Sequence, residues 1–242
     1  TNRDHTQADA ASDDATPAVK KEDYEPLFVD WPDPKYVLFV TGRQHGYIEP
    51  CGCAGLATMK GGLVRRYTFR QQLLERGWEV VPLDVGNQVR RFGRQAEIKF
   101  QMTVEGTKQM DYKAIAFGPD DLRLSVGELV ALTASEGDIS SPFVCANAAV
   151  IDPSLTPRYH VIEAAGQKIG VTAVLGSKEL NKISSDEIVK RDPAEALREV
   201  WAELEQKRCD LYVLLAQTSI EDSKKLAQDC PHFDIVVTAG GA

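Results

Sequence analysis

The sequence has 242 residues, of which 43% are hydrophobic and 26% are charged, and its formal net charge is −8. That length is sufficient to bury one large core or two small ones. The acidic balance argues against binding of a nucleic-acid polymer, because phosphate backbones require a basic protein face. No apolar run approaches the ~20 residues that a membrane-spanning helix needs, so we expect no membrane span.

The N-terminal segment differs in composition from the rest of the chain. Residues 1–25 are polar and acidic and contain almost no large apolar side chains. Such a segment buries too little apolar surface to offset the entropy lost on ordering, so we expect a disordered acidic leader. Residues 26–242 show no internal repeat and predict a single domain.

The first predicted strand, at 36–40 (YVLFV), is rich in β-branched and aromatic residues. A glycine-rich loop follows it, and a helix begins at Leu63. Polar groups between the carboxyl end of a buried strand and a helix are a common place for chemistry in α/β proteins. The loop is therefore our candidate site, and it carries Arg43, His45, Glu49, Cys51 and Cys53.

Helices and strands alternate along most of the remaining chain. In chain order we expect a helix at 63–76, a strand at 79–85, a helix at 95–110, a strand at 114–117, a helix at 127–135, strands at 143–147, 159–164 and 168–175, a helix at 194–207, a strand at 211–215, a helix at 220–228 and a strand at 234–238. A Gly166-Gln167 turn makes a hairpin of the strands on either side of it. The pattern predicts a layered α/β domain with mixed β-sheets.

Several segments resemble the exported 5′-nucleotidases of the calcineurin-like metallophosphoesterase superfamily. The matching segments are Gly61-Gly62-Leu63-Val64-Arg65-Arg66, Pro142 to Asn147, Gly166 to Val171, and Asp192 to Leu197. The resemblance covers about Lys35 to Ala242. It implies an α/β four-layer sandwich, in which two β-sheets pack face to face and helices flank them. It also implies an exported, periplasmic or extracellular location.

The residues at the family's five site motifs depart from its pattern. Arg43 stands where the family has a metal-binding Asp, although His45-Gly46 is kept, and Asn87 replaces the Asp of the second motif. The third motif has become Gly118-Pro119-Asp120-Asp121, which lacks the family's Asn and His. Gln217 replaces the fourth motif's His. The chain stops within the fifth motif, so we expect the domain to be truncated at its C-terminus.

These substitutions predict that the usual pair of metal ions is absent, because a permanent cation at Arg43 repels a dication. The interpretation that follows is a divergent 5′-nucleotidase-like domain acting as a binding or interaction module. The expected ligand is a small anion or a nucleotide, held by Arg43, His45, Asn87 and Gln217.

Two alternatives stay open. One is a metal-dependent hydrolase of phosphoesters or nucleotides with a rebuilt site, whose candidate catalytic residues are His45, Asp120 and Asp121. The other is a redox accessory domain, in which His45, Cys51 and Cys53 bind one zinc or iron ion. Its expected partner is a multihaem cytochrome. The Glu49-Pro50-Cys51-Gly52-Cys53 segment resembles that of nucleotidase-like domains found near multihaem cytochromes in exported bacterial proteins.

Overall fold

The computed structural model describes residues 27–50, 61–135 and 141–240. The chain divides into two compact units, Thr1–Asp33 and Pro34–Ala242. In the described part of the first unit, the rings of Phe28 and Trp31 meet edge to face at 5.0 Å. The predicted leader at 1–25 lies outside the described residues. The second unit carries the strands and helices described next.

The first sheet is parallel throughout and has the strand order β1-β2-β3-β4. Its strands are β1 (Val37–Thr41), β2 (Val80–Asp84), β3 (Ala114–Ala116) and β4 (Phe143–Val144). Helices α1 (Leu63–Glu75), α2 (Arg94–Gln109) and α3 (Val126–Thr133) connect them in turn. Because all four strands run the same way, their carboxyl ends and the loops that follow lie at one edge of the sheet.

The second sheet is mixed, with the order β10-β9-β7-β6. Its strands are β6 (Tyr159–Ala164), β7 (Gln167–Leu175), β9 (Leu211–Gln217) and β10 (Ile235–Thr238). Strands β6 and β7 form the predicted antiparallel hairpin, and Ala165 and Gly166 both adopt positive φ at its turn, as a tight hairpin turn requires. Helices α5 (Pro193–Lys207) and α6 (Ile220–Asp229) precede β9 and β10.

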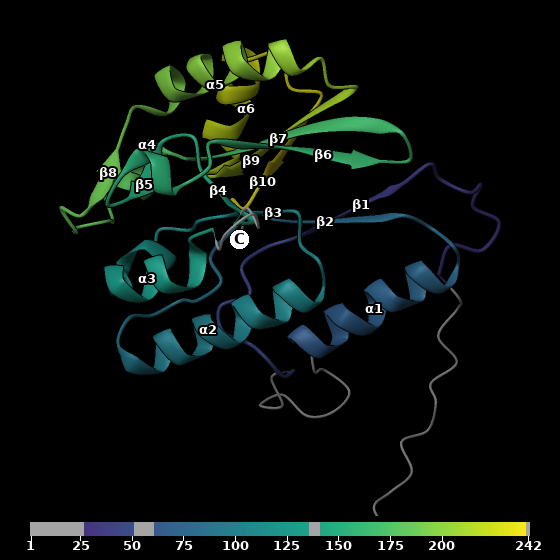
Figure 1. Ribbon diagram of the computed structural model, residues 1–242, viewed down its shortest axis with the longest axis horizontal. Helices are drawn as coiled ribbons and strands as arrows, with labels where there is room; N and C mark the ends of the chain where they lie inside the picture. Colours follow the sequence, from purple (N-terminus) through teal and green to yellow (C-terminus); the bar gives the residue numbers. More distant parts are fainter. Residues whose placement is uncertain (1–26, 51–60, 136–140, 241–242) are drawn as a thin grey trace, which may run out of the picture. The chain divides into compact units, whose positions relative to one another are not determined.

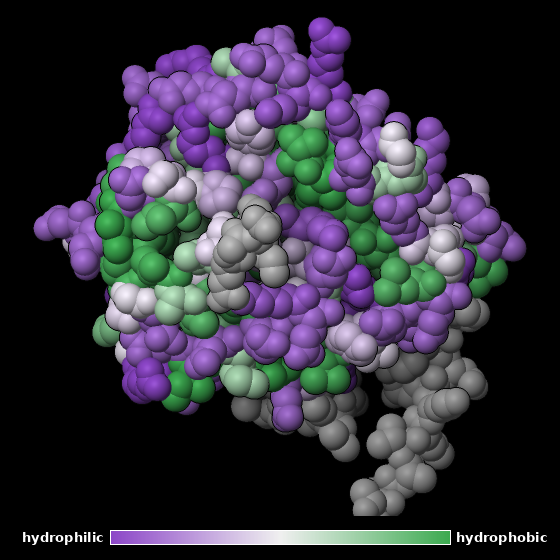
Figure 2. Space-filling view, viewed as in Figure 1, coloured by the Kyte–Doolittle hydropathy of each residue, from purple (hydrophilic) through white to green (hydrophobic). Residues whose placement is uncertain are grey.

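These elements stack in four layers, which Figure 1 shows with α5 and α6 above the second sheet and α1 to α3 below the first. Between the sheets lies one apolar cluster, to which Leu83 and Ala116 contribute from one side and Val171 and Leu215 from the other. In Figure 2, hydrophilic residues cover the exposed face of α5 at the top of the view, and hydrophobic residues show between the layers. The four-layer α/β sandwich expected from the sequence is confirmed.

The outer layers are held by two further clusters. Phe100 of α2 packs on the first sheet, where the rings of Phe117 and Phe143 stack at 4.8 Å. Leu197 and Val200 of α5 are fully buried against the second sheet. Burial of a side chain of this size contributes roughly 1.5–3 kcal/mol, so these contacts fix both helical layers.

The structure corrects the prediction of a strand at 143–147. Strand β4 ends at Val144, because the Asn147 side chain turns the chain by bonding both backbone groups of Leu175. The chain then forms β5 (Ala148–Val150), which pairs antiparallel with β8 (Ile188–Lys190). Neither of these three-residue strands was predicted, nor was the single-turn helix α4 (Ser177–Leu180). Elements this short carry too few residues for a periodic signal.

The loop after β2 passes very close to the loop after β3. Gly86 has φ of 95°, and a Cβ placed there would lie 2.8 Å from the carbonyl carbon of Phe117 and 2.9 Å from the amide nitrogen of Gly118. Both atoms belong to backbone, which does not move aside as a flexible side chain does. Gly86 therefore permits the close approach of these two loops.

We expect Gly86→Ala to destabilise the protein roughly 2 kcal/mol more than Gly77→Ala does, measured by chemical denaturation. Gly77 is the matched control, because its φ is 80° but a Cβ placed there would meet no atom within 4 Å. Both variants carry the strain of alanine at positive φ, and only Gly86→Ala adds a backbone clash. Equal losses of stability in the two variants would contradict the close approach.

Candidate functional site

The loops after β1 and β2 are joined by backbone hydrogen bonds. The amide groups of Arg43, His45 and Gly46 donate to the carbonyl groups of Gly86, Asn87 and Gln88, at 2.8, 3.1 and 2.7 Å. The pairing continues that of β1 with β2, in which Thr41 lies opposite Asp84. The structure thus brings together three of the predicted ligand-binding residues, Arg43, His45 and Asn87.

All three of these residues adopt the left-handed backbone conformation, with φ of 52° for Arg43, 53° for His45 and 60° for Asn87. Asn and His enter this region more readily than most residues, whereas Arg rarely does. Each such residue costs of the order of 1–3 kcal/mol unless its surroundings impose the conformation. Here the shared hydrogen bonds impose it, so the positions at which the side chains leave the loops are fixed.

The carboxylate of Asp84, fully buried at the end of β2, holds this pair of loops in place. It accepts hydrogen bonds from Thr41 Oγ1 at 2.6 Å, the Gly86 amide at 2.8 Å and Gln88 Nε2 at 2.6 Å. Arg66 of α1 lies 3.2 Å from it and neutralises its charge. A buried carboxylate is stable only when it is paired and hydrogen bonded in this way. Asp84 is therefore a brace for the loops.

The loop after β3 is attached to the same assembly by Asp121, which is also fully buried. One carboxyl oxygen accepts from the Val89 amide at 3.0 Å, and the other accepts from the Gly118 amide at 2.8 Å. Burial raises the pKa of Asp121 to about 7, although these backbone N–H groups act in the opposite direction. Asp121 links the second loop to the third and points away from solvent.

Around His45 the electrostatic field is dominated by cations. Burial lowers the pKa of His45, the guanidinium groups of Arg43 and Arg90 lower it further, and only the Asp120 carboxylate acts the other way. Arg43 and Arg90 are both exposed. Asp120 itself lies 3.3 Å from Arg123. At neutral pH, His45 is therefore uncharged, and the positive charge of this surface comes from arginines.

The next candidate residue, Gln217, belongs to the second sheet. It ends β9, where it is 4% exposed and its Nε2 has no hydrogen-bond partner within the described residues. A buried amide donor of this kind usually finds a partner, such as an ordered water or a ligand. Cys51 and Cys53 lie outside the described residues.

Metal-ligand clusters and membrane-spanning helices are both absent from the part of the chain that the structure describes. In the described ranges no three His, Cys, Asp or Glu side chains are grouped in a way that holds a metal ion. Nor does any helix there have the length and apolar character needed to cross a membrane.

Two site residues were not assigned by the sequence analysis. Arg66 belongs to a scaffold segment, and its contact with Asp84 joins residues 18 positions apart. Arg90 follows the second motif within a basic run, and that run was the available signal for a cation close to His45. Arg66 points toward Asp84 and Arg90 lies close enough to His45 to lower its pKa, and a sequence does not show such side-chain directions.

No protein-family model and no curated protein sequence matches this chain. Solved structures do match it in fold. The 5′-nucleotidase precursor from Thermus thermophilus matches with a TM-score of 0.67 at 21% identity, over 84% of this chain and 41% of that one. The NAD nucleotidase from Haemophilus influenzae matches with a TM-score of 0.65 at 17% identity, over 85% of this chain and 38% of that one.

A calcineurin-like phosphoesterase from Bacillus subtilis also matches, with a TM-score of 0.60 at 16% identity, over 83% of this chain and 70% of that one. The chain spans about two fifths of the length of the two nucleotidases. At identities this low the likeness establishes the fold, which is that of metallophosphoesterase structures, and the function has to be argued from the site.

We expect Asp121 to make folding less favourable as pH rises from about 4 to about 7. Its pKa is about 7 in the folded protein, against an ordinary value of 3.8. Between these values the folded state keeps a proton that the unfolded state has released, so the free energy of unfolding falls as pH rises. Asp121→Asn removes this titration.

The measurement is urea denaturation of both proteins between pH 4.5 and 8. The free energy of unfolding of the native protein, minus that of Asp121→Asn, should fall by a few kcal/mol across this range. A difference that stays constant, or that grows with pH, would show that Asp121 is ionised throughout.

Proposed function

We propose that this chain is a 5′-nucleotidase-like domain that binds a small anionic ligand without the paired metal ions of that family and serves as a binding or interaction module. One observation carries the proposal. The two buried carboxylates at the strand ends point inward as braces, while the arginines beside His45 are exposed. The charge offered to a ligand is therefore positive.

The residues present do not fit a pair of divalent cations. Asp84 and Asp121 direct their oxygens at Thr41, Arg66 and backbone amides of the loops. Asn87 and Gln217 are neutral, and Arg43 is a permanent cation. A guanidinium about 4 Å from a dication is repelled by roughly 8 kcal/mol at an effective dielectric constant of ~20, and a neutral amide does not offset that.

The same residues suit an anion such as phosphate or a carboxylate. Guanidinium groups donate paired N–H bonds to planar or tetrahedral oxyanions, and such charge-assisted bonds are roughly twice as strong as neutral ones. Neutral His45 adds a donor without adding charge. Because Asp84 and the paired backbone hold the two loops, the points at which the Arg43 and His45 side chains leave the backbone are fixed before the ligand arrives, which lowers the entropic cost of binding.

The structure bears differently on the two alternatives, the rebuilt hydrolase and the redox accessory domain. A rebuilt hydrolase would need Asp120 or Asp121 as an acid, base or metal ligand. Asp121 is fully buried with both oxygens accepting backbone bonds, and Asp120 pairs with Arg123, so the geometry favours the binding function. The redox alternative depends on Cys51 and Cys53, which lie outside the described residues, and it stays a proposal together with the exported location.

The test is calorimetric titration of the protein with inorganic phosphate, with and without EDTA. We expect binding that EDTA leaves unchanged, and about tenfold weaker binding in Arg43→Gln and in Arg90→Gln, since each loses a charge-assisted hydrogen bond. Lys207→Gln is the control, because it removes the same charge at the end of α5.

Two results would contradict the proposal. One is phosphate binding that disappears with EDTA, which would show that a metal ion holds the anion. The other is hydrolysis of p-nitrophenyl phosphate that depends on added Mn²⁺ and is lost in Asp121→Asn, which would favour the hydrolase.

A further inference from the structure

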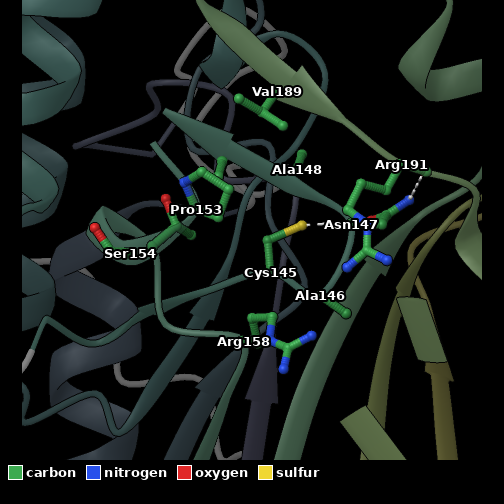
Figure 3. A pocket seen from close by; sticks show the side chains of 11 residues that line it. Cys145, Ala146, Asn147, Ala148, Pro153, Ser154, Arg158, Val189 and Arg191 are labelled. Atoms are coloured by element: carbon green, nitrogen blue, oxygen red, sulfur yellow. Dashed lines mark hydrogen bonds between the residues drawn. The ribbon is translucent and has the colours of Figure 1, made fainter. Parts of the chain in front are cut away.

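A cavity of about 390 Å³ opens beside the two-stranded sheet of β5 and β8. It shares no residue with the loops around Arg43. Its walls come from the turn after β4, from β5 and β8, and from the short 3-10 helix at Pro153–Leu155. Figure 3 shows Cys145 near the centre, with Pro153 and Ser154 to its left, Arg191 to its right and Arg158 below it. A volume in this range is typical of small-molecule sites.

Most of the exposed lining of the cavity is apolar, and the hydroxyl groups of Ser154 and Thr156 also contribute to it. Ala146, Ala148, Val189 and the ring of Pro153 line it, together with the sulfur of Cys145. The polar atoms of Asn147 are already engaged with the backbone of Leu175. An occupant of this interior therefore gains by burying hydrocarbon and finds few hydrogen-bonding groups there.

Two arginines at the rim of the cavity, Arg158 and Arg191, already bind a carboxylate of the protein itself. Both terminal nitrogens of Arg191 donate to Glu199 of α5, one oxygen each. Arg158 donates to the same carboxylate at 3.1 Å and also pairs with Glu203. Two guanidinium groups thus converge on one carboxylate, with the two-pronged geometry that Arg uses for planar anions.

Glu199 is the group that a ligand carboxylate has to displace from these arginines. Its side chain is 48% exposed, so water screens its ion pairs. Glu199 and Glu203 already neutralise the charges of Arg158 and Arg191. A ligand carboxylate therefore has to displace Glu199, because a third carboxylate beside the two arginines would be repelled. The exchange releases Glu199 to water, and burial of the ligand's tail then favours the ligand.

We propose that this cavity binds a small monocarboxylate with an apolar tail. The tail fills the space beside Cys145, and the carboxylate takes the place of Glu199 between Arg158 and Arg191. The arginines at the rim select for a carboxylate, and the volume of the cavity limits the size of the apolar tail. Binding here is independent of any anion at the loops around Arg43.

The test is a titration of the intact chain with hexanoate, followed by amide chemical shifts in two-dimensional NMR, with hexanamide as the neutral isostere. We expect hexanoate to bind at least tenfold more tightly than hexanamide. Arg191→Gln should weaken hexanoate binding about tenfold. Glu199→Gln should strengthen it about threefold, because the competing carboxylate is gone. Arg198→Gln is the matched control, since Arg198 is exposed on α5 outside the cavity.

A second measurement locates the ligand. Ala148 and Val189 line the cavity, so hexanoate should shift their backbone amide signals in the same NMR titration. The amide signal of Cys230, which is buried in another cluster, should be unaffected. Equal affinity for hexanoate and hexanamide, weaker binding in Glu199→Gln, or unchanged amide signals of Ala148 and Val189 at saturating hexanoate would each overturn the proposal.

Discussion

The carboxylate of Asp84 joins parts of the chain that are far apart in sequence. It receives Thr41 from the end of β1, Arg66 from α1, and Gly86 and Gln88 from the loop after β2. Removal of this acceptor would leave the partly buried Arg66 guanidinium, the Thr41 hydroxyl and the buried donors of Gly86 and Gln88 without this partner, and each buried donor left unsatisfied costs about 1–3 kcal/mol. The shape of both loops depends on this one buried group.

The bonds made by Asp84 also determine how charge is distributed at the strand ends. Asp84 holds the second loop against the first, and Asp121 holds it against the third. These two acidic groups, which could attract a cation, are thus engaged inside the protein. At the surface beside His45 lie Arg43, Arg90 and the Asp120 carboxylate, which is itself paired with Arg123. A fold shared with phosphoesterases is therefore compatible with a quite different surface chemistry.

The sequence was most informative where hydrophobic periodicity is long. The strands and the helices of α1, α2, α5 and α6 follow from such patterns, as does the hairpin of β6 and β7. The short pair β5 and β8 does not, because three residues define no period. Strand β3 is equally short and was predicted because Gly118 and Pro119 mark the end of its apolar run. The family resemblance assigned Arg43, His45 and Asn87 to one site, and backbone hydrogen bonds join the loops that carry them.

Side-chain direction could not be predicted in the same way. Asp120 and Asp121 are adjacent and chemically alike, yet one lies beside Arg123 and the other is fully buried on backbone amides. The choice is made by the 3-10 turn that begins at Asp121, which is too short to leave a sequence signal. The cavity near Cys145 is a similar case, since Arg158 precedes β6, Arg191 follows β8 and Glu199 belongs to α5.

The central claim is that the strand-end loops present cations where a phosphoesterase would hold two metal ions. Its most direct test is anomalous X-ray scattering from crystals grown with millimolar Mn²⁺. The account predicts that no pair of manganese ions lies beside Arg43 and that Asp84 and Asp121 keep their present partners. Two manganese peaks about 3.5–4 Å apart at this position, with the Arg43 side chain turned away, would contradict it.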